Sequence, residues 1–285
     1  MSNLKMGWSP DLPDFRDLNM SSRRVRRFQR QIAKNKKIED MPSSIDLSKW
    51  CSPIEDQQNI GSCTAQSGVG LLEYFQNKFH GKHIDGSRLF LYKTTRNLMG
   101  LTGDTGAYLR STMKAMVLFG VCPEKFYPYD VAKFDEEPQA FHYSLAQNFQ
   151  SLKYYRLDGG LKNRNQLLQR IKTNLYYEMP AMFGFTVFSS LYEPTNPGEI
   201  PYPSKGERVY GGHAVVAVGF DDDKEIVNPK DGSVTKGAIK IRNSWGTGWG
   251  EEGYGWLPYH YVVYGLARDW WSLMNNEWVD LSVFN

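Results

Sequence analysis

Residues 56–67 of the chain read Asp56-Gln57-Gln58-Asn59-Ile60-Gly61-Ser62-Cys63-Thr64-Ala65-Gln66-Ser67, a polar loop that leads directly into a helical pattern. Ser62 is a plausible N-cap residue for that helix. The apolar residues that follow recur every three or four positions: Ala65, Val69, Leu72, Phe75 and Phe79. This spacing predicts a helix with one buried face, in whose first turn Cys63 lies.

Cys63 is either a nucleophile or a buried structural thiol. At the start of a helix, unpaired backbone N–H groups and the positive end of the helix dipole stabilise an anion. We therefore expect an acidified thiol, which would be a better nucleophile at neutral pH. Gly68 and Gly70 each disfavour the helix by about 1 kcal/mol, which predicts close packing against that face. On this stretch alone the structural role is the more common one, so the choice depends on residues elsewhere.

The composition is that of an ordinary globular chain. Its 285 residues suffice for one large or two small domains, and 41% are hydrophobic and 23% charged. A formal net charge of +3 gives little indication of a polyanionic partner. No apolar run reaches the roughly 18 residues of a membrane span. The N-terminus lacks the apolar core of a signal peptide, so we expect neither a membrane partner nor signal-dependent export.

The cysteine content favours a reducing compartment. Cys51, Cys63 and Cys122 are too few for the disulfide framework of a small secreted protein, although one disulfide is arithmetically possible. We expect a cytoplasmic protein, and leave open an export route that needs no signal peptide. No residues have the spacing of a metal site, and we expect no metal and no cofactor.

Three segments differ in character. Residues 1–40 form a leader in which a turn-rich stretch is followed by a basic run: Arg23, Arg24, Arg26, Arg27, Arg30, Lys34, Lys36 and Lys37. Residues 41–150 show mainly the helical period, and residues 151–285 show mainly short strands, among them 214–220 and 225–228. The chain therefore predicts an α+β fold of a helical and a β-rich subdomain, with a site between them.

The leader has three interpretations. It is a solvated linker or marginal helix, a docked or cleavable propeptide-like segment, or an arm that binds nucleic acid. The third is disfavoured because no aromatic side chains alternate with the basic ones, so we expect no nucleic-acid partner.

Two residues far from Cys63 have the properties that a thiol nucleophile requires, namely a base and a group that orients the base. His213 opens the apolar strand 214–220, which places its imidazole at the mouth of a buried strand. Asn243 ends another strand pattern, and its amide could accept a hydrogen bond from a histidine N–H. Trp245, two residues on, could cover that bond. Alone, His213 and Asn243 would be an ordinary core histidine and an ordinary strand-end asparagine.

Together, three motifs resemble the papain-like cysteine proteases (family C1), in the same order along the chain. They are Gln57…Gly61-Ser62-Cys63, Gly212-His213-Ala214-Val215 and Asn243-Ser244-Trp245-Gly246-Thr247-Gly248-Trp249-Gly250. The third motif is long and highly specific. The resemblance extends from about residue 46 nearly to the C-terminus. Thr64 after the cysteine, together with the leader, is similar to the bacterial branch of the family.

The resemblance implies four catalytic roles. Cys63 is expected to be the nucleophile and His213 its general base and acid. Asn243 would orient His213. Gln57 would donate from its side chain to the oxyanion, as a second donor beside the backbone N–H of Cys63.

The resemblance also implies substrate-binding positions. Gly106-Ala107 is similar to the extended edge that pairs with the substrate backbone. Gly184 and Ala214 match positions that line the pocket for the second residue before the scissile bond, and because both are small we expect a roomy apolar pocket. Ile60 stands where secreted relatives have a disulfide cysteine, so Cys51 and Cys122 are expected to be free thiols.

The implied protein is a cysteine endopeptidase of papain-like fold. Its helical half would carry the cysteine helix, its other half would be β-barrel-like, and the active-site cleft would lie between them. A peptide or protein substrate would be cut through a thioester on Cys63. The leader would be an intramolecular inhibitor of a zymogen, and its basic run would offer processing sites. The alternatives are an effector-type acyltransferase or deamidase that uses the same Cys-His pair, and a non-catalytic binding module of this fold.

Overall fold

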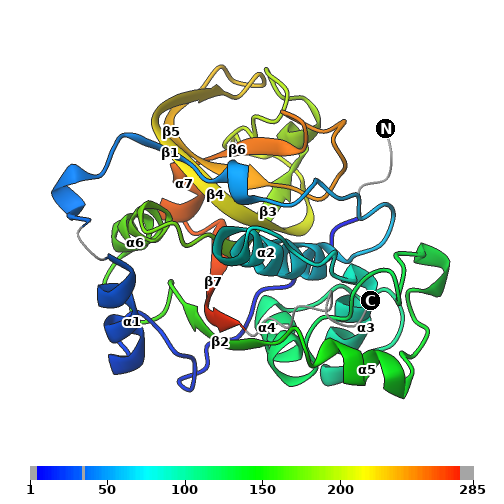
Figure 1. Cartoon of the computed structure of the whole chain (residues 1–285). Coiled ribbons are helices and arrows are strands. Elements are labelled where there is room, and N and C mark those ends of the chain that lie inside the picture. The colour runs from blue at the N-terminus through cyan, green and yellow to red at the C-terminus, as the bar shows by residue number, and fades with distance from the viewer. Residues whose placement is uncertain (1–4, 34–35, 277–285) are drawn as a thin grey trace.

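The computed structural model describes residues 5–33 and 36–276, which form helices and strands in about equal share (Figure 1). The helices are α1 (Arg23–Ala33), α2 (Cys63–His80), α3 (Arg88–Leu98), α4 (Leu109–Leu118), α5 (Ala140–Ala146), α6 (Arg164–Tyr176) and α7 (Tyr259–Val263). The strands are β1 (Ser44–Asp46), β2 (Ser151–Arg156), β3 (Ala181–Phe188), β4 (Val209–Val227), β5 (Val234–Arg242), β6 (Tyr254–Pro258) and β7 (Ala267–Asn276). The expected α+β class is confirmed. None of the helices within these two ranges is long and apolar enough to cross a membrane.

The strands of the described ranges join one antiparallel sheet in the order β2-β7-β3-β4-β5-β6, with β1 paired to β4. The sequence patterns 214–220 and 225–228 predict two strands, but both belong to the single long strand β4. The pattern breaks because the pairing of β4 with β5 changes register between Asp221 and Glu225. β1 lies within residues 41–150, the segment that the sequence predicts to be mainly helical. The division into a helical and a β-rich subdomain at residue 150 stays a prediction.

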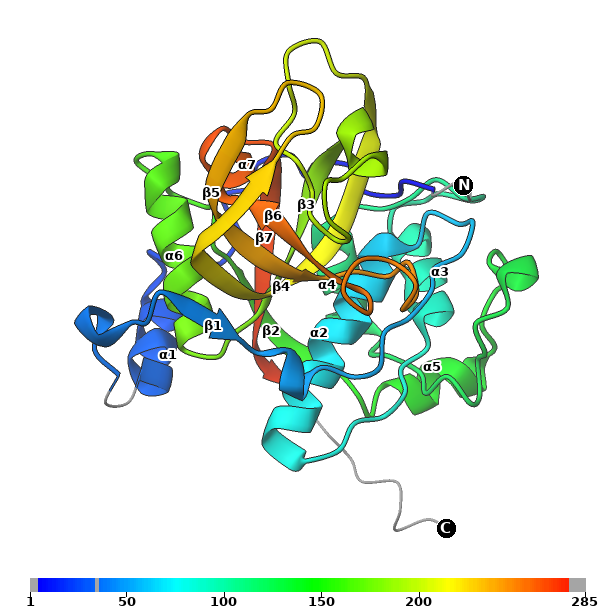
Figure 2. The ribbon, with the colours of Figure 1, turned by 90° about the horizontal axis from the view of Figure 1, so that it is seen from above.

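Helix α2 begins at Cys63, as the spacing predicts, and lies between the sheet and helices α3 and α4 (Figure 2). It packs against β4 on the sheet side. The expectation for Phe79 is wrong: its side chain is 61% exposed and stacks on Phe75. The reason is that burial ends near residue 76, so the last turn of the helix extends beyond the packed body.

Close packing explains two glycines in α2. A Cβ on Gly70 would lie 2.5 Å from Nη1 of Arg242, and a Cβ on Gly68 would lie 3.0 Å from the Thr112 methyl carbon. The predicted close approach is therefore confirmed. It allows the buried Arg242, at the end of β5, to lie directly on the helix backbone.

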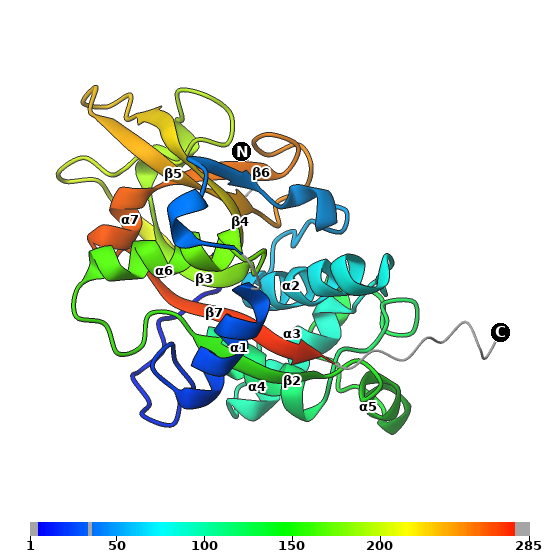
Figure 3. The same ribbon diagram turned by 60° about the vertical axis from the view of Figure 1, so that its left-hand side comes forward.

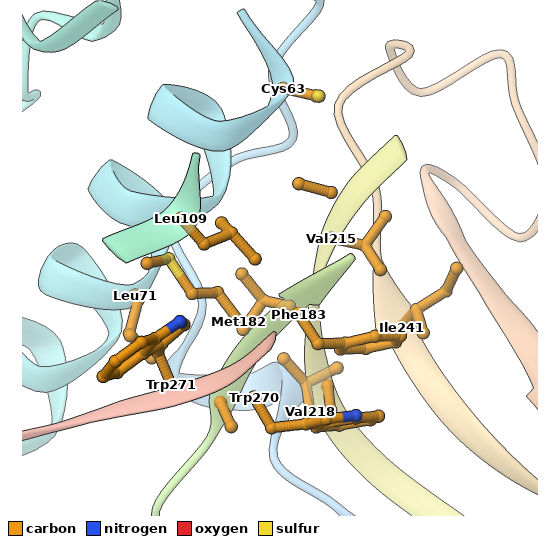
Figure 4. Close-up of a cluster of buried hydrophobic side chains, with 14 of the residues drawn as sticks. Cys63, Leu71, Leu109, Met182, Phe183, Val215, Val218, Ile241, Trp270 and Trp271 are labelled. Atoms are coloured by element: carbon orange, nitrogen blue, oxygen red, sulfur yellow. The ribbon is translucent and has the colours of Figure 1, made fainter. Parts of the chain in front are cut away.

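The hydrophobic core lies between α2 and the sheet (Figure 4). Phe183 stacks on Trp270 with ring centroids 3.8 Å apart, in the layer that joins β3 to β7. Met113 and Met116, on α4, are fully buried. Cys63 lies at the edge of this cluster, at the N-terminal end of α2 (Figure 4).

The leader is docked along the body. Its helix α1 lies beside β2 and β7 (Figure 3). Val25 is fully buried, and the ring of Phe28 meets the ring of Tyr155 edge to face at 6.1 Å. The arginines of the basic run point to solvent: Arg23, Arg24, Arg26, Arg27 and Arg30. The five arginines of the basic run thus lie on a docked amphipathic helix, whereas Lys36 and Lys37 follow it and Lys34 lies outside the described residues.

Candidate active site

Strands β4 and β5 bring His213 and Asn243 together. Nε2 of His213 and Oδ1 of Asn243 are 2.7 Å apart. An amide oxygen only accepts hydrogen bonds, so Nε2 carries the proton. The same Oδ1 accepts the Ser244 N–H at 2.8 Å, which fixes the orientation of the amide. Nδ1 of His213 has no hydrogen-bond partner among the described residues and is the nitrogen left free to take a proton.

Trp245 covers this hydrogen bond. Its ring stacks on the imidazole of His213 with centroids 4.3 Å apart and planes at 21°. Burial lowers the pKa of His213 to about 4, because the imidazolium ion would lose its hydration, although the bond to Asn243 opposes the shift. In this structure the imidazole is therefore neutral at neutral pH.

Cys63 is fully buried, and its thiol is not acidified in this form of the protein. Burial raises the pKa of the thiol to about 11, against the opposing effect of hydrogen bonds from the backbone N–H groups of Ala214 and Gly7. The expected acidification is thus wrong here, because burial removes the water that would solvate a thiolate. Ser62 occupies the N-cap position but makes no capping bond, since its hydroxyl bonds to Tyr129 at 2.7 Å.

Gln57, in the loop before α2, is oriented by Ser244. The hydroxyl of Ser244 donates to Oε1 of Gln57 at 2.8 Å, and the Gln57 backbone N–H donates to the Ser244 carbonyl at 2.8 Å. Nε2 of Gln57 then donates to the carbonyl oxygens of Lys5 at 3.0 Å and Ile60 at 3.1 Å. No sequence pattern pointed to Ser244 itself. The available signal was its place between Asn243 and Trp245.

Gly184 and Ala214 lie directly opposite each other on β3 and β4. The indole of Trp8 fills the space above Gly184, where a Cβ would lie 2.0 Å from the ring. Trp8 is only 6% exposed, and its Nε1 has no partner among the described residues. The indole of the leader therefore lies at the position where the resemblance predicts the substrate pocket.

Gly106 and Ala107 border the path of the leader on the other side. Ala107 donates its N–H to the Gly7 carbonyl at 2.8 Å and accepts the Ser9 N–H at 3.2 Å. These bonds make a parallel bridge between Ala107 and Trp8. A Cβ on Gly106 would lie 2.4 Å from the Gly7 oxygen, so only glycine allows this approach.

The leader is also bonded to the sheet half of the molecule. The Trp8 N–H donates to the Gly212 carbonyl at 3.0 Å, immediately before His213. The sequence contained one signal that the leader is anchored here: Trp8 is a tryptophan in an otherwise polar and turn-rich stretch. No three His, Cys, Asp or Glu side chains in the described ranges gather as metal ligands would.

Comparison with known proteins points to one family. Residues 41–270 match the family model described as papain family cysteine protease. An uncharacterized peptidase C1-like protein, L477, of Acanthamoeba polyphaga mimivirus is 34% identical over 243 residues, which cover 83% of this chain and 74% of that protein. Falcipain-2a of Plasmodium falciparum is 30% identical over 218 residues. That match covers 73% of this chain but only 39% of the falcipain.

Solved structures agree in fold. Xylellain, a cysteine protease from Xylella fastidiosa, superimposes with a TM-score of 0.75 at 30% identity, over 96% of both chains. ProCathepsin B S9 from Trypanosoma congolense superimposes with a TM-score of 0.67 over 94% of this chain and 86% of that one. At 18% identity, the second likeness concerns the fold alone.

Proposed function

Because the chain belongs to the papain family of cysteine proteases and is a cysteine-type peptidase, we propose that it is an endopeptidase with Cys63 as nucleophile, closed in this form by its own leader. The observation that carries the proposal is the hydrogen-bonded pair of His213 and Asn243 next to Cys63. The backbone of Ala214, the residue after His213, is close enough to the Cys63 thiol to lower its pKa.

The chemistry follows from the free atoms of these groups. Nδ1 of His213 takes the proton of the thiol as Sγ of Cys63 attacks the carbonyl carbon of the substrate. Nε2 of Gln57 and the backbone N–H of Cys63 donate to the oxyanion that develops. The C–N bond then breaks, and His213 returns the proton to the leaving amine. Water hydrolyses the thioester with His213 as base, while Asn243 keeps the ring in place.

Replacing the nucleophile tests this function. Cys63→Ala should reduce peptide hydrolysis to the uncatalysed background, because no thioester can form. In the Trp8→Ala chain, in which the leader no longer fills the site, the thiol-directed epoxide E-64 should add to Cys63, as measured by the mass of the labelled peptide. Full activity in Cys63→Ala would rule the mechanism out.

The contacts of residues 5–9 support a leader that blocks the cleft without being cut. Trp8 fills the pocket beside Gly184, and the Lys5 carbonyl takes up the amide of Gln57. The Gly7 backbone lowers the pKa of the Cys63 thiol, as a hydrogen-bond donor does, and the Gly7 carbonyl oxygen accepts the Ala107 N–H instead. A thiolate attacks carbonyl carbon, so a chain bound in this direction inhibits and is not a substrate.

Removing the indole tests the restraint. Trp8→Ala in the full chain should raise kcat/KM for a short peptide roughly 10- to 100-fold, because the burial of a large aromatic side chain contributes about 1.5–3 kcal/mol. Leu12→Ala, a change of an exposed side chain in the same leader, is the matched control and should change little. Equal activity of the parent and Trp8→Ala would contradict the restraint.

A further inference from the structure

The two proposed oxyanion donors belong to different segments of the chain. Nε2 of Gln57 lies in the loop before α2, whereas the backbone N–H of Cys63 lies in the first turn of that helix. Two donors stabilise the same oxygen only when their positions are held to within about 0.5 Å. Residues 58–62, which join the two donors, form turns and no helix or strand. Another part of the chain therefore has to fix the spacing of the donors.

The hydroxyl of Tyr129, in the segment between α4 and α5, joins the loop to the helix. It donates to the Gln57 backbone carbonyl oxygen at 2.9 Å. A carbonyl oxygen only accepts hydrogen bonds, so this bond uses the single proton of the phenol. The Ser62 hydroxyl, 2.7 Å away, therefore donates to the Tyr129 oxygen. One phenol thus bonds the residue that carries the first donor and the residue directly before the second.

The backbone of Gln57 is held from two sides. Its N–H donates to the Ser244 carbonyl, just after β5, and its carbonyl accepts from Tyr129 in the helical half. The next residue, Gln58, has a φ of 55°, in the left-handed region that is unfavourable for a residue with a side chain. Such a conformation persists only where the surroundings hold it. The carbonyl that Tyr129 binds belongs to the peptide group directly before Gln58.

Buried charges hold the ring of Tyr129. The guanidinium carbon of Arg88 lies 4.8 Å from the centre of the ring, close enough for a cation and an aromatic face to attract each other. Arg88 is only 5% exposed and is paired with the carboxylates of Glu55 and Glu124. The phenol therefore packs against a group that is itself fixed, and Glu55 lies only two residues before Gln57.

We propose that Tyr129 is a positioning residue for the oxyanion hole, and that its hydroxyl sets the spacing between the Gln57 amide and the Cys63 N–H. This inference rests on the proposed function. The residue acts through Gln57 and Ser62 and takes no part in the transfer of protons. Its loss should therefore slow the step in which the oxyanion forms and affect substrate binding less.

Tyr129→Phe tests the role of the hydroxyl, because it leaves the ring over Arg88 in place. The background is the more active of the parent and Trp8→Ala chains. For a short fluorogenic peptide, kcat should fall roughly tenfold and KM should change less than about threefold, because the misplaced donors serve the transition state. Tyr127→Phe is the matched control. It removes a hydroxyl that donates to the Glu136 carbonyl at 2.8 Å, and its kcat should stay within about twofold.

Alkylation by iodoacetamide separates this role from a general loosening of the site. In that reaction Sγ of Cys63 bonds to the CH₂ carbon and iodide leaves with the electron pair, so no oxyanion forms. The alkylation rate in Tyr129→Phe should therefore stay within about twofold of its background, as measured by the mass of the labelled peptide. A substitution that only loosened the start of α2 would change the alkylation rate as well.

Ser62→Ala tests the link to the helix. It removes one of the two bonds of the phenol, whereas Tyr129→Phe removes both. In a double-mutant cycle the double variant should therefore have the same kcat as Tyr129→Phe, within about twofold.

The outcomes distinguish the inference from the proposed function. An unchanged kcat in Tyr129→Phe, an equal fall in kcat and in alkylation, or fully additive losses in the cycle would overturn the inference and leave the function standing. If neither the parent nor Trp8→Ala hydrolyses any peptide, the proposed function fails, and the inference fails with it.

Discussion

At the scale of single residues, the orientation of the Gln57 amide depends on one hydroxyl group. Ser244 donates to Oε1 of Gln57, and this leaves Nε2 facing the cleft. A flipped amide would present an oxygen to the developing oxyanion and would repel it. Ser244 is therefore a positioning residue for the oxyanion hole of the proposed mechanism.

Ser244→Ala should lower kcat for peptide hydrolysis roughly tenfold, because the transition state loses a correctly oriented hydrogen-bond donor. KM should change less, because binding of the substrate in its ground state depends less on this donor. The measurement is made in the Trp8→Ala chain, which the proposed restraint predicts to be open. Ser244→Thr keeps a hydroxyl and should recover most of the rate. An unchanged kcat in Ser244→Ala would mean that Gln57 is oriented without this bond.

At the scale of elements, α2 joins the two halves of the molecule through Gly70. The guanidinium of Arg242 lies on the helix at this glycine and donates to the Ser52 hydroxyl at 3.0 Å and to the Pro53 carbonyl at 2.6 Å. The carboxyl of Glu73, one turn along the helix, accepts the Ser52 hydroxyl and has its pKa raised to about 7 by burial. A buried polar network thus fixes the helix against β5.

Gly70→Ala should destabilise the protein by about 1–3 kcal/mol. Helix propensity alone would favour alanine by about 1 kcal/mol. The sign of the change in the free energy of unfolding therefore shows whether helix propensity or the close approach of Arg242 dominates. In Gly68→Ala the nearest atom to the new Cβ is 3.0 Å away, against 2.5 Å in Gly70→Ala, so it should be the milder change. The free energy of unfolding of both variants is measured by urea denaturation. A Gly70→Ala protein more stable than the parent would contradict the packing argument.

At the scale of the whole molecule, the leader is held by a charge cluster as well as by the cleft. Two guanidinium groups and four carboxylates meet at this second anchor: Arg110, Arg156, Asp11, Asp17, Asp158 and Asp269. Asp269, on β7, accepts the Asp11 N–H at 2.7 Å. Burial, and then the nearby charge of Asp11, raise the pKa of Asp269 to about 7, with Asp158 adding to the shift and Arg156 opposing it.

The docked leader should therefore loosen as pH rises. A carboxyl whose pKa is raised by docking favours the docked state at low pH, and this contribution is lost as pH increases from about 4 through about 7. The rate of E-64 labelling of Cys63 in the full chain, divided by the rate in Trp8→Ala, should increase severalfold between about pH 5 and 7.5. Asp269→Asn should remove most of this dependence. A ratio that falls with pH would contradict the sign.

Sequence patterns were sufficient where the relevant contacts are local. The period after Ser62 predicts the start of α2 at Cys63, and the strand pattern that ends at Asn243 predicts the end of β5 to within one residue. They failed where burial depends on distant parts of the chain. Phe79 fits the helical period but lies beyond the packed body, and β4 is continuous because β5 supports it through a change of register.

The sequence by itself determined the fold class, the helix that carries Cys63, and the motifs around Gln57, His213 and Asn243. Each of these follows from the order and spacing of residues that lie close together along the chain. Only the tertiary structure decided that Trp8 lies over Gly184 and that burial raises the pKa of the Cys63 thiol. Both depend on contacts between residues that lie far apart in the chain, such as Trp8 and Gly184. A pKa follows the water and charges that surround a group in space, and these are set by packing and not by sequence neighbours.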